Sequence, residues 1–327
     1  GYITASGKKV AFVDLNLSKS VGGFITNAGF MNVAFGVYDV ASVTYTNCTF
    51  LNGAYASSGN VTFEGCTFKR SHDKYGLWAY GDVTTTVNNC VFPDIRGVKM
   101  YSEGKERTAA LTVTNTDFSA VSQKPAIVLT SGESVTLSGN TYNAEKGVFE
   151  LDLDGVPNGT PVSSTDPITC INDNGACGVL VDGKIYTTLA QAAEVAKAGS
   201  VVTLLHSTTE TVTLPAGSKL DTNGYTAENV AAVAKIGGVY YADIQSAFKA
   251  AKAGDVITFM SDVTYEEANW DCRNTGSKFT VPVTIDGDGH TFKLTSTLND
   301  SNWFTVFRFE ADATVENLTI DMSEAKG

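Results

Sequence analysis

Short stretches of alternating apolar and polar residues recur along the chain, each interrupted at one point by Asn, Asp or Gly. The clearest pair is VTYTNCTF at 43–50 and VTFEGCTF at 61–68. Alternation over four residues predicts a half-buried β-strand, and Asn, Asp and Gly tolerate left-handed backbone. Each copy therefore predicts two short strands that meet at a one-residue corner. Looser copies are TTVNNCVF, LTVTNTDF, VTLSGNTY, VAFVDLNL and ATVENLTI, at 85–92, 111–118, 135–142, 10–17 and 313–320.

The spacing of the copies predicts a coil and not a stack of hairpins. In a parallel β-helix, each turn of the coil (a rung) takes roughly 20 to 25 residues and returns to the same corner ~4.8 Å above the last. The residue after each corner should point inward. These inward residues are Leu15, Cys48, Cys66, Cys90, Thr116, Asn140 and Leu318.

Two columns of this coil are expected to be structural ladders. At the corners, amide side chains can form a hydrogen-bonded ladder, which we predict for Asn47, Asn89, Asn115 and Asn317. Inside the coil, Cys48, Cys66 and Cys90 fall in one column. Stacked residues have parallel Cβ vectors, which suits packing of small apolar thiols better than a disulfide or a metal site.

The pattern changes after about residue 178. DGKIYTTLAQAAEVAKAGSVVTLLHS (182–207) aligns with GGVYYADIQSAFKAAKAGDVITFMSD (237–262). Each copy predicts a short strand, a one-sided helix and an apolar strand. Thr188 with Gln191, and Asp243, are the expected helix N-caps, and Gly199 and Gly254 the expected ends.

These patterns predict a mainly β protein: a parallel β-helix with small α/β cap-like units. We expect a β-helix over 1–154 and a linker over 155–177. A cap-like unit should occupy 178–233, and a second, over 234–327, should continue into β-helix rungs. In the linker, Cys170 and Cys177 either close a small loop or stay apart, and the sequence leaves both open.

The amino-acid composition limits which classes of binding partner and which cellular compartment are expected. A net charge of −12 argues against nucleic-acid binding, and 18% charged residues leave a surface of Ser, Thr, Asn and Gly, typical of extracellular β-rich proteins. No apolar run approaches the ~18 residues that span a bilayer, so no membrane insertion is expected in this segment. Without paired CxxC spacing and with three histidines, the chain predicts no metal and no cofactor.

Residues 10–142 and 281–322 resemble right-handed parallel β-helices of the pectate-lyase-like superfamily. The helical unit followed by TIDGDGHTF (284–292) resembles the N-terminal cap of such coils. Arrays of this kind are typical of adhesin-type repeat proteins on the surface of Gram-positive gut bacteria. The resemblance implies the fold more than the function, because this fold carries lyases, hydrolases, esterases and inert adhesin stalks.

The enzyme signatures of that superfamily are absent from the sequence. No Arg-x-Pro-x-x-Arg segment occurs, and TNTDF (114–118) is a corner phrase. DGDGH (286–290) has no downstream Glu at calcium-ligand spacing, which favours a tight turn. Glu150, Asp152 and Asp154 share one strand face, which favours a solvated face over a site. We therefore name no catalytic residue and expect no enzyme.

The strongest candidate for ligand binding is KRSHDKYGLWAYGD at 69–82. Exposed aromatic rings beside polar groups can stack on sugars. The candidate carbohydrate-binding residues are His72, Asp73, Tyr75, Trp78 and Tyr80. The alternative is that Trp78 and Tyr80 are ordinary strand residues of a rung.

We expect a secreted or cell-surface, non-catalytic structural or adhesive module. The alternatives are a polysaccharide lyase or glycoside hydrolase, or a module that binds host or plant glycans. VENLTI near the end of the chain and FVDLNL near its start share one pattern. The chain is thus expected to be one period of a tandem-repeat protein or of a head-to-tail filament, unless loops of its own cover both terminal rungs.

Overall fold

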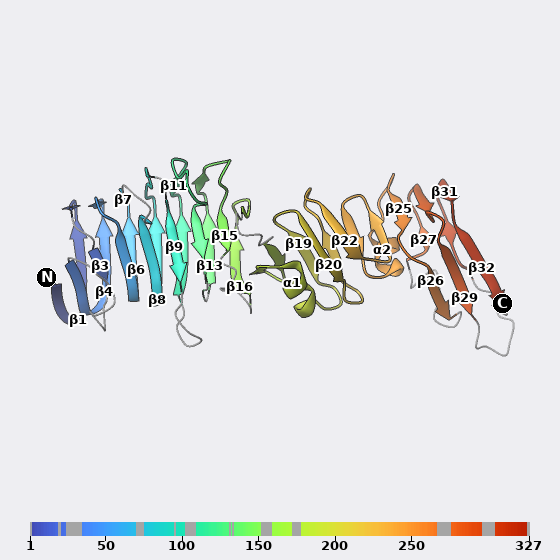
Figure 1. Ribbon diagram of the computed structural model, residues 1–327, viewed down its shortest axis with the longest axis horizontal. Coiled ribbons are helices and arrows are strands. Elements are labelled where there is room, and N and C mark those ends of the chain that lie inside the picture. The colour runs from blue at the N-terminus through green and yellow to red at the C-terminus, as the bar shows by residue number, and fades with distance from the viewer. Residues whose placement is uncertain are drawn as a thin grey trace. The chain divides into compact units, whose positions relative to one another are not determined.

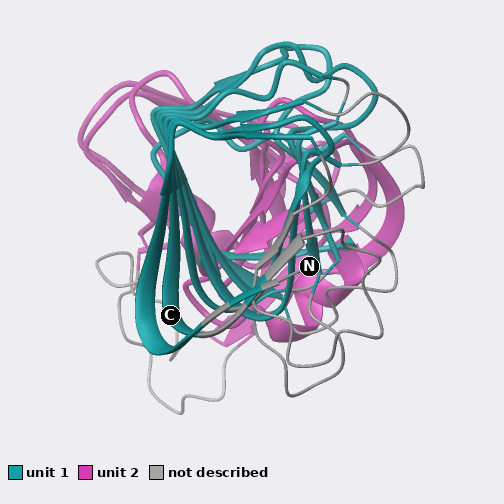
Figure 2. Ribbon diagram, turned by 90° about the vertical axis from the view of Figure 1, so that its left-hand side faces the viewer, with its two compact units in different colours: residues 1–178, 183–188 teal, residues 179–182, 189–327 magenta. Residues whose placement is uncertain are grey.

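The computed structural model divides the chain into two compact units, which are described separately. Unit 1 holds residues 1–178 and 183–188, and unit 2 holds 179–182 and 189–327 (Figure 2). The structure describes residues 2–18, 21–23, 35–69, 75–94, 96–101, 109–130, 132, 134–151, 159–171, 178–266, 276–295 and 305–325.

Unit 1 is a parallel β-helix, which confirms the predicted fold class. Its principal face is a ladder of parallel strands, each paired with the strand one rung later (Figure 1). Alternate residues of these strands are buried, as in the pattern of β8. The strands are β1 (Tyr2–Val13), β4 (Phe35–Thr46), β6 (Ala54–Glu64), β8 (Leu77–Asn88), β10 (Ala109–Thr114), β13 (Ser134–Ser138) and β16 (Thr160–Ser164).

Two further faces close the coil of unit 1. Two-residue strands follow the corners and pair in parallel from rung to rung: β2 (Asn16–Leu17), β5 (Thr49–Phe50), β7 (Thr67–Phe68), β11 (Asp117–Phe118) and β14 (Thr141–Tyr142). The third face contains the first residues of β6 and β8 with β3 (Val21–Gly23), β9 (Val98–Tyr101), β12 (Ile127–Leu129) and β15 (Phe149–Leu151). The inward side chains of each rung therefore pack against those of the next rung.

The corners of unit 1 have the left-handed backbone that their residue types predict. In successive rungs the corner N–H donates to the carbonyl oxygen just before the next corner, at 2.8 to 3.0 Å. This bond fixes the register of one rung on the next. φ lies between 49° and 70° at Asp14, Asn47, Gly65, Asn89, Asn115 and Gly139.

The corner amides do not form an unbroken ladder within the described part of unit 1. Asn115 Nδ2 donates to Asn88 Oδ1 at 3.2 Å and not to another corner. A Cβ at Gly65 would lie 2.6 Å from Asn47 Oδ1, and one at Gly139 would lie 2.8 Å from Asn115 Oδ1. The amide of one corner thus lies where a side chain at the next corner would be, so the ladder expected at Asn47, Asn89 and Asn115 is interrupted.

The interior of unit 1 is a set of stacked columns. Phe50, Phe68, Phe92 and Phe118 stack in order, with ring centroids 4.6 to 5.1 Å apart. Aromatic pairs of this geometry contribute beyond the area they bury. The column after the corner holds three free, buried thiols, Cys48, Cys66 and Cys90.

The thiols are packing groups with weak hydrogen bonds. Cys66 Sγ lies 3.4 Å from the Tyr45 carbonyl oxygen, and Cys90 Sγ lies 3.2 Å from that of Asn88. Burial raises the pKa of the Cys48 thiol above its usual value. A buried thiol that stays protonated behaves as a small hydrophobic side chain.

The coil of unit 1 extends into the segment predicted as a linker. Strand β16 pairs in parallel with β13, one rung beyond the expected end at 154. Just after it, the Asp166 carboxylate accepts hydrogen bonds from the backbone N–H of Gly139 (2.6 Å), from Asn140 Nδ2 (2.8 Å) and from the Tyr142 hydroxyl (3.0 Å). Asp166 thus takes the place of the carbonyl that another rung would offer to the last corner. Cys177 lies outside the described residues, so both alternatives for Cys170 and Cys177, a closed small loop or two separate cysteines, stay open.

Unit 2 contains both predicted helices, α1 (Leu189–Val195) and α2 (Ile244–Ala250), each with one buried face. Asp243 is the N-cap of α2, because its carboxylate accepts from Ser246 N at 2.7 Å. In α1 the backbone N–H groups of Leu189 and Ala190 donate to the Glu210 carboxylate at 3.1 and 3.0 Å. Glu210 is 20 residues further along the chain, and helix-capping rules do not reveal it.

The strands around the helices of unit 2 mix antiparallel and parallel pairs. The antiparallel pairs include β17 with β19, β21 with β24 and β23 with both β24 and β25. The bounds are β17 (Val179–Val181), β19 (Val201–Leu204), β20 (Thr208–Thr213), β21 (Lys219–Asp221), β22 (Ala227–Ala231), β23 (Ala234–Ile236), β24 (Val239–Tyr241) and β25 (Val256–Phe259). Strand β18 (Lys184–Tyr186) belongs to unit 1 and pairs with β16.

After α2 the chain coils again. The parallel sets are β25–β28–β31, β26–β29–β32 and β27–β30, and Phe248 of α2 packs against Phe259, Phe279 and Phe307. The second cap-like unit therefore continues into rungs. The bounds are β26 (Val263–Glu266), β27 (Lys278–Phe279), β28 (Val283–Asp286), β29 (Thr291–Thr295), β30 (Arg308–Phe309), β31 (Ala313–Glu316) and β32 (Thr319–Glu324).

Replacing the corner glycine tests whether the corner sets the stability of unit 1. Gly65→Ala should lower the free energy of unfolding by about 2 kcal/mol, because a Cβ strains the left-handed backbone and displaces the Asn47 amide. Gly7→Ala is the control, since Gly7 has a similar φ of 65° but no neighbour within 4 Å. It should cost about 1 kcal/mol. Equal losses in urea denaturation would contradict the role of the Asn47 contact.

Removing the carboxylate at the end of the coil tests the last corner. Asp166→Ala should lower the free energy of unfolding by about 2 to 3 kcal/mol, since it leaves several donors without an acceptor. Asp117→Ala is the matched control, because Asp117 accepts one turn bond from Ser119 N, and its loss should stay below about 1 kcal/mol. Thermal or urea unfolding measures both, and a control as damaging as the variant would refute this role.

Candidate functional site

The candidate site is an outward-facing group of aromatic rings on the third face of unit 1. Tyr55 of β6 pairs with Trp78 of β8, and Tyr80 of β8 pairs with Tyr101 of β9. In β8 these positions alternate with buried Leu77 and Ala79, so the strand pleat turns the rings outward. We call Tyr55, Tyr75, Trp78, Tyr80 and Tyr101 the aromatic cluster.

The rings of the aromatic cluster contact one another in two groups. Tyr55 and Trp78 lie 6.1 Å apart between centroids, and the edge of Tyr75 meets Trp78 at 5.7 Å and 82°. Tyr80 and Tyr101 stack in parallel at 5.4 Å. Each stacked ring shares one face with its neighbour, and the exposed part of the ring can contact a sugar.

The ring of Tyr75 is less accessible to a ligand than the sequence suggested. Its side chain is 8% exposed, and two cations lie over its ring: the Arg96 guanidinium at 5.3 Å and the Lys99 ammonium at 6.0 Å from the centroid. Tyr75 therefore supports Trp78 from the side and is not an open stacking platform. Neither cation was singled out in the sequence, where both look like isolated surface charges.

The indole nitrogen of Trp78 is a buried donor without an acceptor. Nε1 makes no hydrogen bond to any described residue. An unsatisfied buried donor costs free energy, which an incoming acceptor would recover. Of the five residues predicted to bind carbohydrate, the structure places Tyr75, Trp78 and Tyr80 together, while His72 and Asp73 lie outside the described residues.

Two carboxylates of unit 1, those of Glu64 and Glu150, have partners one rung away. Glu64 accepts both bonds of the Asn88 amide nitrogen, at 2.8 and 3.0 Å. Glu150, predicted to lie on a solvated acidic face, forms an ion pair with Lys124 at 2.8 Å. Asp152 and Asp154 fall outside the described residues.

The DGDGH segment of unit 2 is a turn that locks a corner. Asp286 Oδ1 accepts from the backbone N–H of Asp288 at 3.0 Å and from Asn317 Nδ2 at 3.1 Å. Asn317 itself has a φ of 53°. Among the described residues, no group of three or more His, Cys, Asp and Glu side chains could hold a metal ion.

The histidines of unit 2 make local contacts. His290 Nδ1 lies 3.4 Å from Asp262 Oδ1, and that carboxylate also accepts from Thr291 N at 2.8 Å. His206 stacks on Tyr225 at 6.2 Å. Among the described residues, His290 bonds to one carboxylate and His206 to the backbone carbonyl of Ser207. Neither histidine forms a hydrogen bond to the side chain of a described serine, threonine or cysteine.

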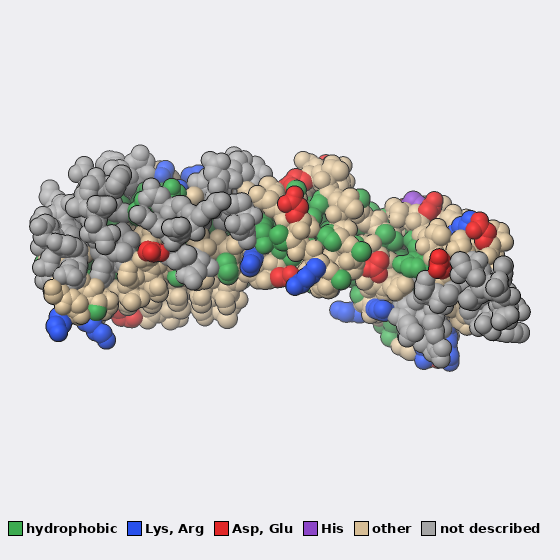
Figure 3. Space-filling view, turned by 90° about the horizontal axis from the view of Figure 1, so that it is seen from below, with side chains coloured by type: hydrophobic (Ala, Val, Ile, Leu, Met, Phe, Trp, Pro, Cys, Tyr) green, Lys and Arg blue, Asp and Glu red, His purple; other side chains and the backbone are tan. Residues whose placement is uncertain are grey.

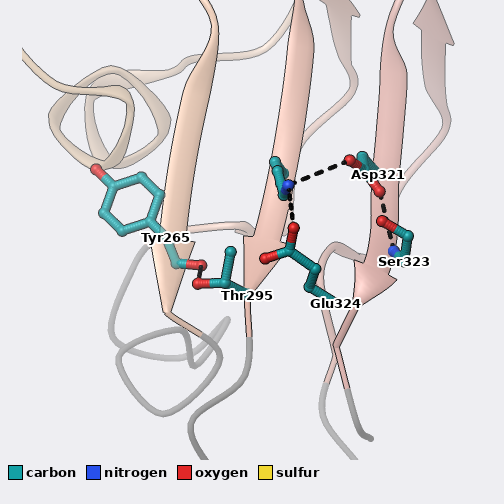
Figure 4. A network of polar contacts seen from close by, with 6 residues as sticks. Tyr265, Thr295, Asp321, Ser323 and Glu324 are labelled. Carbon is teal, nitrogen blue, oxygen red and sulfur yellow. Dashed lines mark hydrogen bonds and ion pairs between the residues drawn. The ribbon is translucent and has the colours of Figure 1, made fainter.

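A polar network joins the last rungs of unit 2. Lys293 Nζ lies 2.6 Å from Glu324 Oε1 and 3.8 Å from Asp321 Oδ2, and Asp321 accepts from Ser323 N (Figure 4). The hydrogen bond to Glu324 raises the pKa of the Lys293 ammonium. One ammonium between two carboxylates is a cross-rung ion pair.

Unit 2 also has an open pocket of about 270 Å³. Ser218, Lys219, Tyr241, Ser246 and Lys249 are among its lining residues. Its volume falls below the 300 to 1,000 Å³ typical of small-molecule sites. The pocket therefore does not compete with the aromatic cluster as a candidate site.

Comparison with known proteins identifies the scaffold of unit 1. Residues 11–159 match the family model described as a right handed beta helix region. The coil is thus a right-handed parallel β-helix. No curated protein matches the chain, and no solved structure does. Within the described ranges, no helix has the length and apolarity to cross a membrane.

The corner network of Asp286 gives unit 2 a pH dependence. Hydrogen bonds from Asp288 N and Asn317 hold the pKa of the Asp286 carboxyl below its usual value. Its contribution to stability is fully present above the unfolded pKa of about 3.9 and is lost as pH falls through the folded pKa. Urea unfolding between pH 5 and pH 2 should therefore be less pH-dependent in Asp286→Asn. Parallel curves for the variant and the wild type would show that the carboxylate contributes nothing.

Proposed function

We propose that the chain is a non-catalytic structural or adhesive module of an extracellular surface protein. The observation that carries this proposal is that five carboxylates of the chain form bonds between neighbouring rungs. Those of Glu64, Glu150, Asp166, Asp286 and Glu324 each bond to a residue one rung away. These groups hold one rung on the next and are not poised around an open site.

A glycoside hydrolase on this scaffold would need a different arrangement. Hydrolysis uses two carboxyl groups roughly 5 to 9.5 Å apart, one of them protonated and both facing the sugar. Asp321 and Glu324 are the carboxylates joined by a common partner in Figure 4, and that partner is the Lys293 ammonium. The pKa of Asp321 is lowered, chiefly by hydrogen bonds from Ser323, so it is a poor general acid.

The side-chain composition of the surface supports an extracellular location. In Figure 3 the charged side chains of the described residues form small groups, and most of the described surface in view consists of other side chains and backbone. With a net charge of −12, this surface suits solubility more than adhesion to anionic membranes or nucleic acid.

Activity screening tests the non-catalytic role. The purified chain should release neither reducing ends nor unsaturated products from pectin-type polyuronates, host glycans or plant glucans, with and without added Ca²⁺. Turnover that disappears in Glu150→Gln or in Asp321→Asn, with folding intact, would establish an enzyme and refute the proposal.

The aromatic cluster supports carbohydrate binding as a second function on the same scaffold. Trp78 supports this function, because its ring is partly exposed and its Nε1 has no hydrogen-bond acceptor among the described residues.

Binding titrations with uronate and neutral oligosaccharides test this second function. Trp78→Ala should weaken binding about tenfold, and Trp78→Phe, which keeps the ring and loses the N–H, about threefold. Tyr225→Ala in unit 2 is the control, because Tyr225 is an aromatic residue outside the aromatic cluster that stacks on His206. Equal affinity in Trp78→Ala and the control, with both folded, would exclude the aromatic cluster as the site.

A further inference from the structure

The open pocket of unit 2 is built from both of its helix-containing repeats. Lys219 of β21 and Tyr241 of β24 are direct partners in an antiparallel pair, so their side chains lie on the same face of the sheet. Lys249 of α2 and the chain segments at 199–200 and 217–218 also line the pocket. All of these residues belong to unit 2, so the pocket is defined within one compact unit.

Two lysines of the pocket carry charges without a counter-ion. Within the part of the chain that the structure describes, Lys219 and Lys249 form neither an ion pair nor a side-chain hydrogen bond. Other lysines of the same unit are paired, as Lys278 is with Glu310 at 3.3 Å. Because like charges repel, two unpaired ammonium groups at one pocket favour an anion between them.

The hydroxyl of Tyr241 is a third donor at the pocket. Tyr241 is 5% exposed, and its hydroxyl forms no hydrogen bond to any described residue. Burial raises the pKa of this hydroxyl, and the carboxylates of Asp255 and Asp221 raise it further, so it stays protonated at neutral pH. A buried donor without an acceptor costs free energy, which an acceptor on a ligand would recover.

The carboxylates around the pocket are held by bonds of their own. Asp221 and Asp255 each accept a backbone N–H of their own turn, at 2.9 and 2.7 Å. Asp243 accepts the hydroxyl of Ser246, a pocket residue, at 2.7 Å. Ser246 therefore presents its oxygen as an acceptor, which suits a hydroxyl group of a ligand.

The backbone of the lining segments favours a carboxylate over a phosphate. Gly199 N donates to the Gly217 carbonyl at 2.8 Å, and Lys219 N donates to the Ser200 carbonyl at 3.1 Å. Phosphate sites typically use a cradle of free backbone N–H groups, and these N–H groups are already used. Ammonium and hydroxyl groups on side chains suit a carboxylate, which accepts charge-assisted hydrogen bonds.

The volume of the pocket limits the size of its ligand. About 270 Å³ is too small for an oligosaccharide and sufficient for one sugar ring. We propose that this pocket binds a monosaccharide that carries a carboxylate. Lys219, Lys249 and the Tyr241 hydroxyl would hold the carboxylate, and Ser246 would accept a hydroxyl of the sugar. The proposal depends neither on the aromatic cluster of unit 1 nor on the absence of catalysis, so each can fail alone.

Calorimetric titration of the full chain with glucuronate and with glucose, at constant ionic strength, tests the pocket. Wild type should bind glucuronate at least about tenfold more tightly than glucose, and Lys219→Gln should weaken glucuronate binding about tenfold. Lys252→Gln is the matched control, because it removes the same charge from an exposed lysine that does not line the pocket. The control should bind glucuronate like wild type.

Tyr241→Phe separates binding from folding, because it keeps the ring and removes the unpartnered hydroxyl. Its urea unfolding should match that of wild type, while its affinity for glucuronate should fall about fivefold. Wild type that binds no glucuronate would overturn the proposal, as would equal affinities in Lys219→Gln and Lys252→Gln. Glucuronate binding that Trp78→Ala abolishes would place the ligand at the aromatic cluster and refute the pocket. Inorganic phosphate that binds as tightly as glucuronate would refute the assignment of a carboxylate.

Discussion

One residue per rung with a positive φ organises the coil of unit 1. The left-handed corner turns the chain between two faces and aims its own N–H at the carbonyl of the next rung. That bond fixes register, and register decides which side chains stack, because a slip of one residue would turn every inward side chain outward. The aromatic and thiol columns therefore depend on Asn, Asp and Gly at the corners.

The corner also explains the polar chemistry of the molecule. A coil must satisfy the donors of its last corner, and in unit 1 the Asp166 carboxylate does so where no further carbonyl is present. Asp286 has a related role in unit 2, where it binds the corner amide of Asn317. These two carboxylates therefore hold parts of neighbouring rungs together.

Much of the fold could be predicted from the sequence because its determinants are local. The corner residues, the strand alternation and the Asp243 cap of α2 lie within a few positions of what they control. Glu210 and Asp166 could not be predicted, since each acts on backbone more than 20 positions earlier without a repeating pattern. One part of the candidate site could be predicted, because the alternation of β8 turns Trp78 and Tyr80 outward. The position of Arg96 over the Tyr75 ring could not, because it depends on how neighbouring rungs stack.

Native-state amide hydrogen exchange tests the role of the corners most directly. If the corner bond fixes register, the amides of Asn47, Asn89 and Asn115 exchange as slowly as the most protected strand amides of unit 1, although all three side chains face solvent. Exchange at the rate of exposed turns, with the flanking strands still protected, would show that the corners follow the stacking of the strands and do not set it.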